Sequence, residues 1–126
     1  MKNVRTYAAN CLKEEAQAIM GLIPLLDDNF DKAVEMIYNC QGKVIVTGVG
    51  KSGHIGAKIA ATLSSTGTPS FFLNPLDAYH GDLGVVTSQD IVVAISNSGQ
   101  TDELLRFVPM LIHMGIPIIG MSGNPK

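Results

Sequence analysis

Short apolar runs alternate with helix-like segments over most of this sequence, from Lys43 onward. The runs are continuous rather than interrupted at every second residue, as strands buried on both faces require. Alternating strands and helices are typical of βαβ units with a parallel sheet. We therefore expect an α/β fold, a three-layer αβα sandwich around a doubly wound, flavodoxin-like parallel sheet. The expected strands are KVIVTG (43–48), PSFFLN (69–74), DIVVAIS (90–96) and IPIIGMSG (116–123).

Helical spacing of apolar residues predicts four main helices. Two lie upstream of the strands, over 4–26 and about 30–40, with Asp28 or Asn29 as N-cap of the second. The other two follow the first and third strands, and they cover 53–67 and 101–115.

Pro109 lies inside the last helical segment, where it would kink the helix or stand near its first turn. We see no linker, so we expect one domain over 1–126, with a helical part, 1–42, and a βαβ part, 43–126.

Composition excludes several classes of protein. The chain has 126 residues and a net charge of −2 without a basic run, so a nucleic-acid partner is not expected. No apolar run reaches the roughly 18 residues of a membrane span, and the N-terminus lacks a signal-peptide core. Cys11 and Cys40 show no metal-ligand spacing. A reduced, cytoplasmic protein is the expectation, although sequence alone does not exclude a disulfide.

The loop after the first strand, GVGKSG (48–53), has the glycine spacing of a phosphate-binding turn. A dinucleotide site also needs an acidic residue about 20 positions on, and none occurs between Lys51 and Leu76. A nucleotide P-loop needs a glycine where Ile45 stands. Either the loop binds another phosphate, with Gly50 and Ser52 as candidate ligands, or its glycines only permit a tight turn.

The loop after the third strand, SNSGQTDE (96–103), gathers small polar residues before a helix. A helix N-terminus offers free N–H groups and a favourable dipole to an anion. Ordinary N-capping needs only one such residue, so the number of polar groups favours a phosphate site. The candidate ligands are Ser96, Asn97, Ser98, Gly99 and Thr101.

The expected strand order, 2-1-3-4-5, makes the first and third strands neighbours. Ligands of doubly wound sheets bind beyond the carboxyl ends of the strands, where the order reverses. The two loops would then face each other, and Lys51 and Glu103 would reach one pocket from opposite walls.

Four segments together resemble the sugar isomerase (SIS) domain of the D-arabinose-5-phosphate isomerases, enzymes of 3-deoxy-D-manno-octulosonate (Kdo), lipopolysaccharide and capsule biosynthesis. They are GVGKSGHIG, STGTPSFFLNP, AYHGDLG and AISNSGQTDE. The resemblance covers nearly all of residues 3–126. It implies isomerisation of D-arabinose 5-phosphate and D-ribulose 5-phosphate through an enediol, without cofactor or metal, in a homotetramer with active sites between subunits.

The resemblance also assigns roles. The family's catalytic lysine, first catalytic glutamate and motif histidine fall on Lys51, Glu103 and His80. Its phosphate loop falls on Ser96, Asn97, Ser98 and Thr101, with Ser52 nearby.

Two departures from the family accompany these matches. Asp77 stands where the family usually has Glu, and the chain stops at GNPK. The family's domain continues there with a second glutamate and a histidine. The resemblance therefore implies a SIS domain incomplete at its C-terminus and inactive by itself.

The residues leave alternatives open. Glu103 is either the base for the C2 proton or a favourable charge at a helix N-terminus. Lys51 either stabilises enediolate or phosphate charge or is a solvated lysine. His80 either transfers protons or is a hydrogen-bonded loop histidine. His54 and His113 have weaker claims, and His80 with Asp82 and His54 lacks a recognised metal spacing.

Two other functions also stay open. A SIS domain that binds sugar phosphate without turnover would keep both loops. A 6-phospho-3-hexuloisomerase-like enzyme would use the same chemistry on a hexulose.

Overall fold

The computed structural model describes residues 3–79, 82–97 and 102–123. By its internal contacts the chain divides into two compact units, residues 1–35 and residues 36–126. The first unit is helical and the second contains the sheet.

Helix α1 covers Val4–Met20, and a short 3-10 helix, η1, covers Ile23–Leu25. The single helix expected over 4–26 is therefore wrong in its last turn. Gly21 ends α1, with its N–H bonded to the Gln17 carbonyl at 2.8 Å. Glycine is a poor helix former and the nearby Pro24 lacks an N–H, so a continuous helix is disfavoured here.

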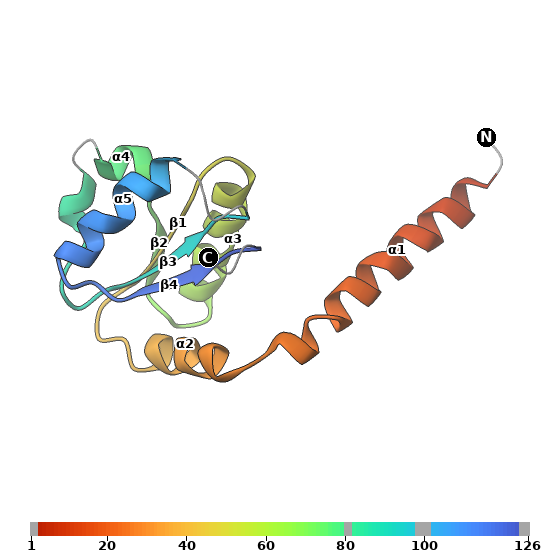
Figure 1. Ribbon diagram of the computed structural model, residues 1–126, viewed down its shortest axis with the longest axis horizontal. Helices are drawn as coiled ribbons and strands as arrows, with labels where there is room; N and C mark the ends of the chain where they lie inside the picture. Colours follow the sequence, from red (N-terminus) through yellow and green to blue (C-terminus); the bar gives the residue numbers. More distant parts are fainter. Residues whose placement is uncertain (1–2, 80–81, 98–101, 124–126) are drawn as a thin grey trace. The chain divides into compact units, whose positions relative to one another are not determined.

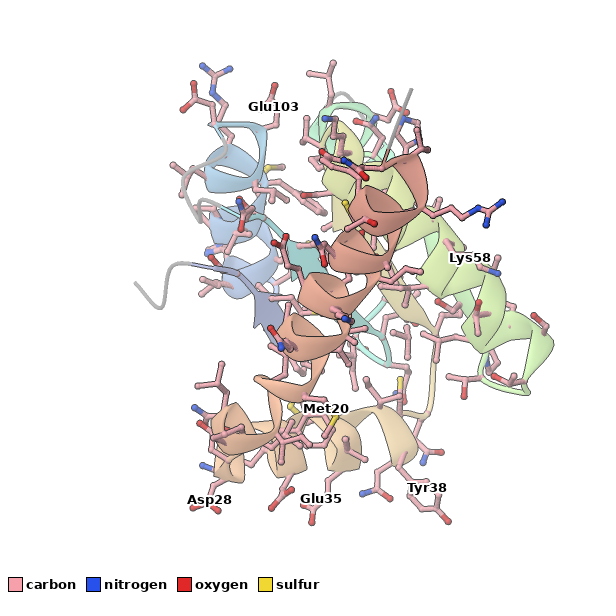
Figure 2. The ribbon with its side chains drawn as sticks, turned by 90° about the vertical axis from the view of Figure 1, so that its right-hand side faces the viewer. Met20, Asp28, Glu35, Tyr38, Lys58 and Glu103 are labelled. Carbon is pink, nitrogen blue, oxygen red and sulfur yellow. The ribbon has the colours of Figure 1, made fainter. Side chains whose placement is uncertain are left out.

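Helix α2 covers Asp28–Tyr38. Its cap is Asp27, whose Oδ1 accepts a hydrogen bond from the Phe30 amide at 3.1 Å, and not Asp28 or Asn29 as expected. Figure 2 shows Asp28 and Glu35 on the same side of this helix.

In the described part of the chain, the sheet has four parallel strands in the order β2-β1-β3-β4. This is the expected flavodoxin-like order, and the α/β sandwich is confirmed. The strands are β1 (Val44–Gly48), β2 (Ser70–Phe72), β3 (Ile91–Ile95) and β4 (Ile118–Met121).

Helices lie on both faces of this sheet (Figure 1). One face carries α3 (Lys51–Ser65). The other carries α4 (Pro75–Tyr79), the 3-10 helix η2 (Asp82–Val85) and α5 (Asp102–His113). Both α3 and α5 begin beyond the carboxyl ends of the strands that precede them.

Alternate residues of β1 separate two apolar cores. Val44 and Val46 are buried in the core that includes Ala60 of α3. Ile45 is buried in the other core, with Leu104, Phe107 and Leu111 of α5 among its members. Side chains of a strand point alternately to its two faces, so both faces of β1 are covered.

Pro109 lies at the eighth position of α5 and does not end the helix. Of the two expected placements, the one near the first turn is therefore wrong. The inner face of the helix remains apolar and buried at Leu104, Phe107 and Leu111, and this packing offsets the N–H that proline lacks.

A buried carboxylate joins the amino ends of the two central strands. Asp90 accepts hydrogen bonds from the backbone amides of Lys43, at 2.7 Å, and Thr87, at 2.8 Å. Burial favours its neutral form, but the two amides and the Lys43 charge outweigh this effect. The pKa of Asp90 therefore lies below its ordinary value of 3.8.

Candidate functional site at the carboxyl edge of the sheet

The carboxyl ends of β1 and β3 are neighbours, because Gly48 pairs with Ile95. The chain leaves β1 through Val49 and Gly50 into α3, and it leaves β3 through Ser96 and Asn97 toward α5. The prediction that the first and third strands are neighbours is confirmed. That the two loops face each other stays a prediction.

Two glycines shape the first loop. Gly50 has φ 62° and ψ −128°, a backbone conformation that residues with a Cβ rarely adopt. A Cβ at Gly53 would lie 2.8 Å from the Gly48 carbonyl oxygen, so a larger residue would push α3 away from β1. These glycines permit a tight turn that places the start of α3 directly against the strand end. Phosphate binding by this loop stays a prediction.

The first turn of α3 is suited to an anion. Gly50, its N-cap, has no side chain to cap the helix, and the first turn holds no acidic residue. The first N–H groups of an α-helix lack intrahelical partners and attract negative charge. Lys51 is exposed and Ser52 is half-buried in this turn, so a cation and a hydroxyl accompany the free amides.

The start of the second loop is held by the end of β4. The Ser96 amide donates to the Met121 carbonyl at 3.0 Å, and the Gly123 amide donates to the Asn97 carbonyl at 3.0 Å. Ser96 is buried and Asn97 is exposed. The other predicted ligands of this loop, Ser98, Gly99 and Thr101, lie outside the described residues.

Glu103 is half-buried in the first turn of α5 and directly follows the exposed Asp102 in the sequence. Figure 2 labels Glu103 at the start of this helix. Lys51 begins α3 on the opposite face of the sheet. The two charged residues thus approach the same edge from opposite layers, in agreement with the expected topology. That they share one pocket stays a prediction.

The histidines differ in placement. His54 is exposed in the first turn of α3, and His113 is exposed at the last position of α5. His80 lies outside the described residues. Within residues 3–79, 82–97 and 102–123, no three His, Cys, Asp or Glu side chains gather as metal ligands.

Helices α4 and η2 occupy the connection between β2 and β3 on the α5 face and were not predicted from the sequence. A local signal was present. Asn74 Oδ1 accepts a hydrogen bond from the Leu76 amide at 2.9 Å, and Pro75 occupies the first helical position. An Asn–Pro pair of this kind favours a helix start.

Thr47 has no role predicted from the sequence. Its side chain is fully buried, and its hydroxyl has no hydrogen-bond partner in the described part of the chain. Asp77, the departure from the family pattern, is exposed in the first turn of α4. No described helix is long and apolar enough to cross a membrane.

Three comparisons place this architecture among known proteins. The family model of the SIS domain matches residues 36–126. The arabinose 5-phosphate isomerase KdsD of Yersinia pestis is 52% identical over 115 residues, which are 91% of this chain and 35% of the relative. The chain thus spans about a third of the length of the curated relatives that it matches.

Two solved structures share the fold and about two fifths of the aligned residues. The c3406 protein of E. coli CFT073, solved in complex with arabinose 5-phosphate, has a TM-score of 0.88 and 41% identity, covering 98% of this chain and 67% of that one. A protein of Bacteroides fragilis, described as a candidate phosphosugar isomerase involved in capsule formation, has a TM-score of 0.89 and 38% identity, covering 96% of this chain and 65% of that one. With most of its length matched by the family model and by these structures, this chain belongs to the SIS domain family.

Proposed function

We propose that the protein containing this chain is a phosphosugar isomerase that interconverts D-arabinose 5-phosphate and D-ribulose 5-phosphate through an enediol. The observation that carries the proposal is 52% identity to an arabinose 5-phosphate isomerase over 91% of the chain. The structural neighbour solved with arabinose 5-phosphate supports the same substrate class.

The phosphate is proposed to bind between the two loops at the carboxyl edge of the sheet. The uncapped first turn of α3 supplies backbone amides, with Gly50 and Ser52 as the proposed ligands from this loop. Ser96 and Asn97 leave the neighbouring strand at the same edge. Ser98, Gly99 and Thr101 complete the proposed phosphate loop.

The proposed chemistry moves one proton between two carbons. Glu103 removes the C2 proton of the open-chain aldose while O1 takes up a proton, which gives the enediol. The enediol then takes up a proton at C1 as the O2 hydroxyl loses its proton and C2 becomes the carbonyl. Lys51 stabilises the negative charge that develops on the oxygens. His80 transfers protons during ring opening. One carbon is oxidised as its neighbour is reduced, so no external oxidant or cofactor is needed.

A homo-oligomer is part of the proposal, a tetramer by analogy with the family. Within the unit of residues 1–35, no described side chain is buried. An isolated helix of this length is marginal in water unless an apolar face is covered. Exposed apolar residues of this unit include Tyr7, Leu12 and Ile19. A second subunit would cover them.

We also propose the cytoplasm as the compartment, since Cys11 and Cys40 are both free thiols. A role in Kdo, lipopolysaccharide or capsule biosynthesis is proposed from the same resemblance, and the Bacteroides fragilis neighbour described as involved in capsule formation supports it.

An assay of the full-length protein tests the function. We expect turnover of arabinose 5-phosphate without added metal or cofactor and little turnover of a 3-hexulose 6-phosphate. Preference for the hexulose would indicate a 6-phospho-3-hexuloisomerase. Binding of sugar phosphate without turnover of either substrate would indicate a regulatory domain. We expect the 126-residue chain alone to be inactive, because the resemblance places two further catalytic groups beyond it.

A further inference from the structure

Thr47 carries a buried hydroxyl that folding does not explain. The residue is 0% exposed in β1, and its Oγ1 has no hydrogen-bond partner among the described residues. Burying a hydroxyl without a partner destabilises a folded protein, and such groups in native structures call for an explanation.

The position of Thr47 brings this hydroxyl close to the candidate site along the chain. Thr47 directly precedes Gly48, from which the first loop departs. In the sheet it pairs with Ala94 of β3, two residues before Ser96. Strand alternation places it on the face of Ile45, which is the face covered by α4 and α5.

Other polar groups near the strands have the partners that Thr47 lacks. The Ser70 hydroxyl donates to the Val44 carbonyl at 2.6 Å, and both carboxylate oxygens of Asp90 accept backbone amides. Valine has nearly the shape of threonine and would fill the same space without an unpaired polar atom. Packing and strand propensity would therefore be served at least as well by valine.

We propose that Thr47 is a positioning residue of the sugar-phosphate site, whose hydroxyl gains its hydrogen bond when the sugar phosphate is bound. The proposal rests on the proposed function. A hydroxyl unpaired in the free protein and paired in the bound protein adds to ligand affinity, because its desolvation is already complete before binding. The unpaired Thr47 hydroxyl would thus destabilise the ligand-free protein and strengthen binding of the sugar phosphate.

Two variants of the full-length protein separate the hydroxyl from the methyl group. Thr47→Val replaces the hydroxyl with a methyl group, and Thr47→Ser keeps the hydroxyl and removes the methyl group. We expect Thr47→Val to unfold at an equal or higher temperature while its kcat/KM for arabinose 5-phosphate falls about tenfold or more, as for a lost buried hydrogen bond. Thr47→Ser should unfold at a lower temperature and keep kcat/KM within about threefold.

Binding of arabinose 5-phosphate, measured by calorimetry, distinguishes the two proposals. If wild type isomerises the sugar and Thr47→Val matches it in kcat/KM, the role of Thr47 is overturned and the proposed function stands. If wild type binds without turnover and Thr47→Val binds about tenfold more weakly, isomerisation is overturned and Thr47 keeps its role. Equal losses in both variants would show that packing, and not the hydroxyl, is responsible. A wild type that neither binds nor turns over the sugar overturns both.

Discussion

Asp90 Oδ1 accepts a 2.7 Å hydrogen bond from the backbone amide of Lys43, and this contact ties the residue before β3 to the residue before β1. Gly42 makes the approach possible, because a Cβ there would overlap Asp90 Oδ1. Gly42, Lys43 and Asp90 lie at the amino ends of the strands, opposite the candidate site. Substitutions of these residues should therefore lower the stability of the fold more than they lower catalytic activity.

Asp90→Ala should destabilise the fold strongly. The change leaves the partly buried amides of Lys43 and Thr87 without their acceptor, at up to about 1–3 kcal/mol for each. Denaturant unfolding of the full-length protein at fixed concentration measures the loss. Glu14→Ala, at an exposed carboxylate of α1, is the control and should change stability by less than about 0.5 kcal/mol. Similar stability of the two variants would contradict the assigned role of Asp90.

The stabilising effect of Asp90 should also depend on pH. Its pKa is lower in the folded chain than in the unfolded one, so its contribution is complete above the unfolded value of about 3.9. It is lost as pH falls through the folded value. Melting temperatures of wild type and Asp90→Asn should therefore differ at neutral pH and converge in acid. A difference that stays constant with pH would show that ionisation of Asp90 is not involved.

Gly53→Ala should disturb both the fold and the first loop. The new Cβ would lie 2.8 Å from the Gly48 carbonyl oxygen, and overpacking of this kind costs about 1–3 kcal/mol. We expect a lower melting temperature and weaker binding of arabinose 5-phosphate. Gly84→Ala is the matched control, since nothing lies within 4 Å of its added Cβ. Unchanged binding in Gly53→Ala would argue against a phosphate site at the start of α3.

Glu103→Gln should lower kcat by about 10²–10⁴, the usual contribution of a general base, while the affinity for sugar phosphate persists. Exchange of the C2 proton of arabinose 5-phosphate in heavy water reports the step directly. Asp102→Asn is the control from the same helix turn. If charge at the N-terminus of α5 were the only role of Glu103, both variants would lose activity to the same small extent. If Glu103→Gln exchanges the C2 proton at the wild-type rate, another residue is the base.

Lys51→Ala should weaken binding as well as turnover, because the ammonium charge acts on the bound phosphate and on the enediolate alike. KM should therefore rise and kcat should fall. Lys58→Ala removes an exposed lysine farther along the same helix, and Figure 2 shows Lys58 on the outer side of α3. It should behave as wild type. Equal kinetics of the two variants would identify Lys51 as an ordinary solvated lysine.

The sheet could be predicted from the sequence because its signal is local. Runs such as residues 44–46 and Ile91–Ile95 are continuously apolar, as strands covered on both faces require. Helix α4 was not predicted because it has five residues, too few for apolar residues to repeat at helical spacing. The predicted end of α1 was too late in the sequence, because a glycine such as Gly21 is tolerated inside many helices. Here the helix ends at Gly21, with Pro24 close behind it.

The candidate site was predictable only in part. Glycine spacing and strand order placed Lys51 and Glu103 at one edge, since parallel strands bring their carboxyl ends together. Thr47 could not be identified, because the absence of a hydrogen-bond partner among the described residues depends on packing from distant segments. In the sequence it is one more β-branched residue of an apolar run.

The pairing of β1 with β3 has a consequence for how the protein folds. Between these neighbours in space the chain makes α3, β2, α4 and η2, so the two loops can meet only after this long crossover is complete. Such non-local pairing is a slow event in folding. A sugar phosphate that contacts both loops would therefore bind the finished sheet and not its precursors. Its concentration would raise the stability of the native state by mass action and slow the rate at which the sheet opens.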